Sequence, residues 1–201
     1  PMARPKDDAM KARPSARRTA PRRAVRRTAP KRIAPQKLFK YVSKDGGYEI
    51  LLLGKPEIKT QVVPTVAGKL TMTFAMVQQK GNGCGPRLGC MSAAAHNDIP
   101  EAVRKKTTPE KMLDGARDGA LKNTASSLVS EKKIKLDGKY PGREIKMKRS
   151  FGPGDANLMV NHVRIIMVNN KMYPIQSITT KPYVGTPAIR KVLESFKLTG
   201  K

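Results

Sequence analysis

Two histidines are the side chains best suited to acid–base chemistry near neutral pH, and the sequence holds only two. His162 alternates with Arg164 in an apolar run, which predicts a solvent-facing position on a strand. His96 precedes Asn97 and Asp98 and is expected in a turn. The acidic residues are scattered, and no pair has a spacing typical of acid–base catalysis. We therefore expect no catalytic residue, and a protein that is not an enzyme.

Cys84 and Cys90 are the only cysteines, in a glycine-rich stretch. The simplest interpretation is two unlinked thiols; the alternatives are a local disulfide, worth about 2–3 kcal/mol at most, and a metal pair. A metal ion would need two more ligands, and His96 and His162 lie far apart in the chain. Residues 81–85 lack the Lys-Ser/Thr that completes a phosphate-binding loop, so a turn is expected there. The sequence predicts no metal and no cofactor.

Positive charge is the stronger functional signal. The 201 residues include 41 Lys and Arg against 15 Asp and Glu, which gives a net charge of +26. A surface of this sign attracts polyanions such as nucleic acid, acidic lipid headgroups or an acidic protein face. Within the folded part, the predicted polyanion-binding residues are Arg104, Lys105, Lys106, Lys133, Lys135, Lys146 and Lys148.

Four of these lysines lie on two predicted strands. Lys133 and Lys135 share one face of their strand, and Lys146 and Lys148 share one face of theirs. If the strands are neighbours, we expect one positive stripe; the alternative is an ordinary solvated face. Five Tyr, four Phe and no Trp leave little for base stacking, so any nucleic-acid binding should be phosphate-directed, non-specific and salt-sensitive.

Residues 1–35 predict a disordered basic arm, because they hold 12 Lys and Arg, two Asp and almost no large apolar side chains. The pattern Arg-Arg-Thr-Ala-Pro at 17–21 recurs at 26–30, and the prolines prevent a continuous helix. We expect an extended arm that binds polyanions; the alternatives are a solubilising tail or a targeting remnant. Its candidate residues are Arg13, Arg17, Arg18, Arg22, Arg23, Arg26, Arg27, Lys31 and Arg32.

Residues 36–201 predict an α+β domain. Thr108-Pro109 and Thr186-Pro187 combine a capping residue with a proline suited to the first helical turn, so two main helices should begin there. Asn169-Asn170 suits a hairpin turn. We expect a mostly antiparallel sheet of six to eight strands, packed by the two helices. The predicted strands lie within 38–42, 48–53, 58–63, 70–77, 129–134, 142–147, 160–168 and 172–178, and residues 91–95 could form a further short strand.

This order of elements resembles the PsbP-like family, including its uncharacterised bacterial members, over about residues 38–199. The motifs that carry the resemblance are 41–48, the helix 112–127, Leu-Asp-Gly-Lys-Tyr-Pro-Gly-Arg-Glu at 136–144, the hairpin 164–175 and the ending 193–198. The resemblance implies a sheet sandwiched by helices, a non-enzymatic accessory role and an extracytoplasmic or envelope address. The arm lies outside the family pattern, and segment 80–95 replaces what should be a regular strand.

Two functions remain open. The first is an accessory or structural protein that docks on a larger assembly and lays its basic arm on an anionic surface. The alternative is a cytoplasmic protein that binds nucleic acid without sequence specificity, in a nucleoid or on RNA. No apolar run approaches the roughly 18 residues of a membrane span, so none is expected. The sequence gives no oligomeric state.

Overall fold

The computed structural model describes residues 37–65, 68–81, 84, 88–154 and 157–199. The chain divides into two units, residues 1–32 and 33–201, and the described residues belong to the second. The predicted arm, residues 1–35 with its nine candidate cations, lies outside the described residues.

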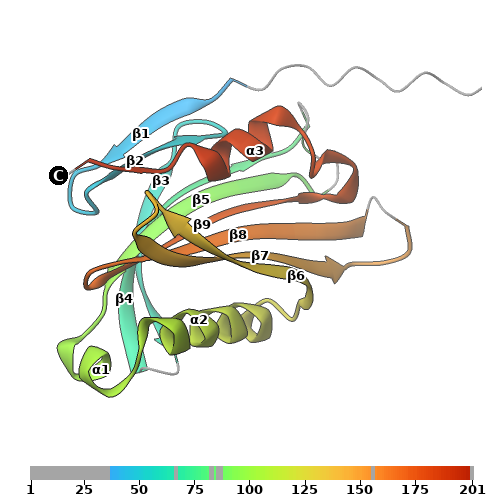
Figure 1. Ribbon diagram of the computed structural model, residues 1–201. Coiled ribbons are helices and arrows are strands. Elements are labelled where there is room, and N and C mark those ends of the chain that lie inside the picture. The colour runs from blue at the N-terminus through green and yellow to red at the C-terminus, as the bar shows by residue number, and fades with distance from the viewer. Residues whose placement is uncertain (1–36, 66–67, 82–83, 85–87, 155–156, 200–201) are drawn as a thin grey trace, which may run out of the picture. The chain divides into compact units, whose positions relative to one another are not determined.

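The described residues form an α+β domain in which two antiparallel sheets contain all the strands (Figure 1). A small sheet has the order β1-β2-β10 and a large one the order β3-β4-β5-β9-β8-β7-β6. The strands of the small sheet are β1 (Phe39–Ser43), β2 (Tyr48–Leu52) and β10 (Lys197–Leu198). Those of the large sheet are β3 (Glu57–Thr65), β4 (Gly68–Gln79), β5 (Cys90–Asp98), β6 (Ser127–Leu136), β7 (Tyr140–Ser150), β8 (Leu158–Val168) and β9 (Lys171–Thr180).

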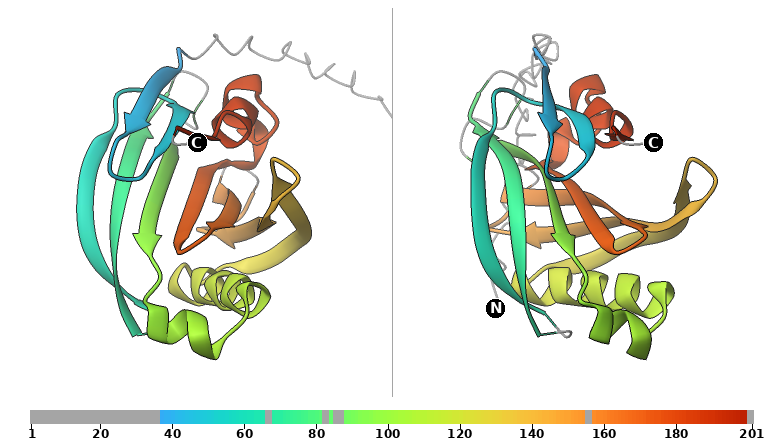
Figure 2. Two further views of the ribbon diagram at one scale, coloured as in Figure 1. Left: turned by 60° about the vertical axis from the view of Figure 1, so that its left-hand side comes forward. Right: turned by 90° about the vertical axis from the view of Figure 1, so that its left-hand side faces the viewer.

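Helices cover both faces of the seven-stranded sheet. Figure 2 shows α2 (Pro109–Asn123) below the sheet, and α3 (Pro187–Glu194) with the small sheet above it. Two shorter elements complete the set, α1 (Glu101–Lys106) and the 3-10 turn η2 (Lys181–Tyr183). Because both faces are covered, the strands of the large sheet must bury side chains in both directions.

Two hydrophobic cores follow from this layering. Strand β8 sends Val163 and Ile165 toward α2 and Ile166 toward α3, and all three are buried. The upper core joins the small sheet and α3 to the large sheet around Tyr48, which packs edge-on against Tyr173. The lower core joins α2 to strands β7, β8 and β9.

The predicted α+β class with mostly antiparallel strands is confirmed, and both helices begin where expected. The Thr108 hydroxyl caps α2 by accepting a hydrogen bond from the Lys111 amide at 3.3 Å. Thr186 precedes α3 without a side-chain capping bond. Asn169 has a φ of 53°, as the predicted hairpin turn requires.

Several predictions about the elements are wrong. The described residues form ten strands in two sheets rather than six to eight in one, because a separate hairpin and the C-terminal β10 make a second layer. The helix α1 was not predicted. Segment 80–95 does not replace a strand either, since β5 begins at Cys90 as a regular central strand.

Cys84 and Cys90 form a disulfide, so the simplest interpretation of two unlinked thiols is wrong and a metal pair is excluded. Both cysteines are buried in the upper core. The bond closes the connection between β4 and β5 at the start of β5.

A buried cation attaches α2 to the sheet. The side chain of Arg143 in β7 is only 4% exposed, and its guanidinium donates to Glu110 and Asp114 of α2, the latter at 3.0 Å. Its Nε lies 3.1 Å from Glu131 Oε1 in β6. The hydrogen bond from Arg143 lowers the pKa of Glu110. One planar donor group thus holds carboxylates from a helix and a neighbouring strand.

Replacing Arg143 with Met should destabilise the domain by about 3 kcal/mol, because it leaves three carboxylates clustered without their cation. Urea unfolding followed by circular dichroism measures the change. The control is Arg190→Met on α3, an exposed arginine that donates to the Gly185 carbonyl, for which a loss below about 0.5 kcal/mol is expected. Equal stabilities of the two variants would contradict the role given to Arg143.

Candidate binding sites

The two histidines do not lie where the sequence predicted. The side chain of His162 is 17% exposed rather than solvent-facing, and its Nε2 lies 3.2 Å from Glu144 Oε1. Glu144 Oε2 accepts a hydrogen bond from Arg164 Nε at 2.8 Å. His96 is not in a turn: it lies within β5, buried, with its ring centroid 5.9 Å from that of Tyr48.

Partial or full burial disfavours the protonated form of both histidines. It lowers the pKa of His96, and it lowers the pKa of His162 despite the opposing effect of Glu144. No group of three or more His, Cys, Asp or Glu among the described residues could hold a metal ion. The described residues also include no helix long and apolar enough to cross a membrane.

Three of the predicted cations lie together in the last turn of α1. Arg104, Lys105 and Lys106 form the C-terminal end of this helix, where cations interact favourably with the helix dipole. Lys105 pairs with Glu101 one turn earlier at 2.9 Å, and both side chains are exposed. Exposed pairs of this kind contribute about 0–1 kcal/mol, so the cluster remains available to an external anion.

The expected single stripe on β6 and β7 is wrong. The two strands are neighbours, but Lys133 pairs with Arg143 whereas Lys146 pairs with Ser130. Paired residues share a face, and faces alternate along a strand. Lys133 and Lys135 therefore lie on the α2 face of the sheet with Arg143, and Lys146 and Lys148 lie on the opposite face.

A different lysine completes the stripe on the α3 face. Lys132 pairs with Glu144, which places it on the same face as Lys146 and Lys148. We call these three the lysine stripe. No ion pair of theirs is found among the described residues. Glu144, the cross-strand partner of Lys132, is itself paired with Arg164. The alternation within each strand could be predicted, but not which residues face each other across the pair.

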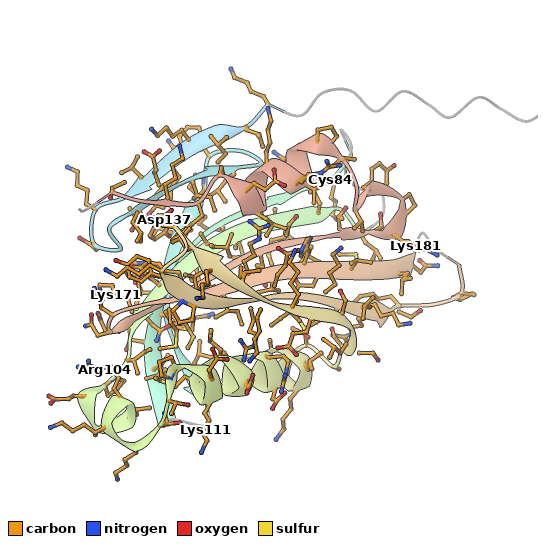
Figure 3. All side chains as sticks on the ribbon, viewed as in Figure 1. Cys84, Arg104, Lys111, Asp137, Lys171 and Lys181 are labelled. Carbon is orange, nitrogen blue, oxygen red and sulfur yellow. A yellow bond between two sulfur atoms is a disulfide. The ribbon has the colours of Figure 1, made fainter. Side chains whose placement is uncertain are left out.

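A large hollow lies between α2 and the seven-stranded sheet, with a volume of about 560 Å³. Native interiors hold few voids larger than a water molecule, whereas ligand pockets measure about 300–1,000 Å³. Figure 3 shows the side chains of both layers, with Lys111 labelled on α2. The apolar lining comes from strands β3, β4, β5, β8 and β9, the β5–α1 connection and α2. It consists of Val63, Leu70, Met72, Phe74, Ala93, Ala95, Ile99, Met112, Ala116, Ala120, Val163, Ile165, Met172 and Pro174.

Small residues on both sides explain why the hollow exists. The lining face of α2 carries Gly115, Ala116, Gly119 and Ala120, which recur at helical spacing. A methyl group added at Gly119 would meet no atom within 4 Å. The sheet opposite presents the alanines Ala93 and Ala95 of β5. Sequence analysis missed the hollow because small residues in a helix indicate close packing as readily as open space.

Polar groups in the lining are few. Six polar lining residues are uncharged. Lys111 is the single ionisable side chain among the described residues that line the hollow. Lys111 is exposed, and no ion pair of its ammonium is found in the described part of the chain. The uncharged polar residues are Gln61, Asn97, Thr107, Asn123, Thr124 and Gln176.

The arrangement of elements is similar to that of a cyanobacterial PsbP. The solution structure of this protein, CyanoP from Synechocystis, gives a TM-score of 0.47 at 11% sequence identity, covering 85% of this chain and 98% of that chain. The crystal structure of a Pseudomonas aeruginosa protein of unknown function gives a TM-score of 0.35 at 8% identity, covering 73% and 85%. No family model and no curated protein matches the sequence. Membership of the PsbP-like family stays a prediction.

The two histidines should make stability fall in mild acid. Each has a lowered pKa in the folded state, so below about pH 6.5 the unfolded chain takes up protons that the native chain does not. Stability should be constant above about pH 7.5 and should decline toward pH 5.5, by at most about 1.4 kcal/mol per pH unit for each histidine. Chemical unfolding at a series of pH values measures the slope, and His162→Gln should remove part of it. A flat profile in the unsubstituted protein would contradict the lowered pKa of both histidines.

Proposed function

We propose that this protein is a non-catalytic accessory protein that docks on a larger assembly and binds an anionic surface of that assembly with its basic residues. The observation that supports the proposal is the unequal pairing of charges. The described carboxylates are largely engaged within the domain, and the lysine stripe has no ion-pair partner among the described residues. An acidic external surface would supply the missing partner charges.

The internal pairing is extensive. Glu110, Asp114 and Glu131 surround Arg143, and Glu144 binds Arg164. Further pairs join Asp98 to Lys171 at 2.8 Å and Glu49 to Lys40 at 2.8 Å. Because most of the described carboxylates already form ion pairs, the net positive charge comes from Lys and Arg side chains that have no carboxylate partner among the described residues. The α2 face of β6 differs, since Lys133 lies 3.7 Å from Glu110.

The alternative is non-specific binding to nucleic acid. The net charge of +26 favours it, and so do the lysines of the neighbouring strands β6 and β7. Such binding would be directed at phosphates and would weaken steeply with salt. An extracytoplasmic address goes with the docking proposal, as the sequence resemblance implies, and a cytoplasmic one with the alternative.

Neutralising the lysine stripe should weaken binding to an acidic protein surface. We expect Lys146→Gln/Lys148→Gln to lower the affinity for polyglutamate about tenfold, at roughly 0.5–1 kcal/mol per cation. The matched control is Lys133→Gln/Lys135→Gln, which removes the same charge from the opposite face and should change the affinity less than threefold. Isothermal calorimetry at fixed ionic strength measures both. Equal losses would show that only net charge matters, and duplex DNA bound more tightly than polyglutamate would favour the alternative.

Deleting residues 1–35 should remove much of the binding and leave the fold intact. If half of the twelve cations in this segment contact phosphates, the log–log salt slope for duplex DNA should become less steep by about 5. Filter binding from 50 mM to 200 mM salt measures the slope, and a thermal melt should shift by no more than a few degrees. A large loss of thermal stability would contradict a separate arm, and a flat salt response of the full chain would exclude the nucleic-acid alternative.

A further inference from the structure

We propose that the hollow between α2 and the seven-stranded sheet binds a single-chain amphiphile, with its acyl chain inside and its anionic headgroup at Lys111. This site lies on the face of the sheet opposite the lysine stripe. It is therefore independent of the proposed docking function, and either proposal can fail alone.

The walls suit a flexible apolar chain. The hollow holds about 560 Å³, and Leu70, Phe74 and Ile165 contribute to its apolar lining. Met112 and Met172 line it as well, and methionine adapts its shape to irregular apolar ligands. Binding of an acyl chain in such a site is favoured because it removes apolar surface of both the ligand and the protein from water.

The length also fits an acyl chain. Lys111 and Asn123 are the first and last residues of α2 that line the hollow, and Asn123 lies twelve positions after Lys111. At 1.5 Å per residue the lining face of α2 is about 18 Å long. One leaflet of a bilayer, half of a hydrocarbon core of about 30 Å, holds acyl chains of a similar length.

The charge of the lining selects the headgroup. Lys111 is the single ionisable side chain among the described lining residues, and no carboxylate lines the hollow. The neighbouring carboxylates Glu110 and Asp114 are held by Arg143, so they do not neutralise the ammonium. A lysine on a flexible four-carbon stem can reach a carboxylate or phosphate at the mouth.

Other occupants fit less well. A peptide segment would bring backbone N–H and C=O groups into a lining that offers six uncharged polar side chains, and unpaired groups of this kind disfavour burial. A flat aromatic ligand would find one aromatic ring in the described lining, that of Phe74. An unbranched acyl chain has no polar groups that need hydrogen-bond partners inside the hollow, so it matches the apolar lining best.

Gly119 offers a substitution that fills the hollow without disturbing the fold. A Cβ at this position meets no atom within 4 Å, and glycine is unfavourable inside a helix. Gly119→Leu should therefore keep or raise the melting temperature while occupying the space of the acyl chain. The matched control is Gly185→Leu, since a Cβ at this exposed glycine also meets nothing within 4 Å and Gly185 does not line the hollow.

The experiment is calorimetric titration of the delipidated full chain with tetradecanoate, tetradecanol and a lysophosphatidic acid of the same chain length. Tetradecanoate or the lysolipid should bind at one site. Gly119→Leu should weaken binding at least tenfold, and Gly185→Leu should not change it. Lys111→Gln should weaken binding of the anionic ligand about tenfold and leave tetradecanol unchanged.

The outcomes distinguish between the two kinds of lipid that could supply the acyl chain. Binding of tetradecanoate alone supports a free fatty acid, and binding of the lysolipid alone supports a lipid with a phosphate headgroup. Binding of neither anionic probe, or wild-type affinity in Gly119→Leu, overturns the proposal. Equal affinity for tetradecanol and tetradecanoate overturns the headgroup assignment to Lys111. If Gly119→Leu fails to fold, Lys111→Gln still decides through the comparison of charged and neutral probes.

Discussion

Side chains alternate between the two faces along every strand of the seven-stranded sheet, and the position of each candidate group follows from this alternation. On β4 the upper-facing Ala75 and Val77 join the core beneath α3, while Leu70, Met72 and Phe74 face the hollow beside α2. The same rule divides the lysines of β6 and β7 between the faces. The sheet therefore keeps a charged surface and an apolar hollow on opposite sides of one layer of backbone.

Arg143 is what makes this separation stable on the α2 side. Its buried guanidinium ties the first turns of α2 to β7 and, through Glu131, to the edge strand β6. Arg117 of α2 adds a second link to Glu131, at 2.8 Å. With ion pairs and Leu113 holding the helix over β7, its glycine- and alanine-rich face does not need to pack closely on β4 and β5. The hollow can persist because the contacts that hold the helix lie beside it.

Local signals in the sequence predicted local structure well. The strand at 70–77, the cap at Thr108 and the Asn169-Asn170 turn depend on neighbours in the chain, and the structure contains all three. Features that depend on distant partners were missed. The face of Lys146 relative to Lys133 is set by a register across two strands, and the burial of His96 is set by Tyr48 of another sheet. The disulfide was one of three open alternatives, because a spacing of two cysteines does not determine their geometry. The arm candidates, 1–35, lie outside the described residues.

The position of β6 at the edge of the sheet gives its lysines a second consequence. β6 pairs only with β7 among the described strands, so the backbone donors and acceptors on its outer side are open to another extended chain. Lys132, Lys133 and Lys135 lie along this edge, and like charges there oppose the approach of a second copy of the strand. An anion bound at the lysine stripe would cancel part of that repulsion. If the protein binds polyanions as proposed, an excess of them would therefore favour pairing of two β6 edges.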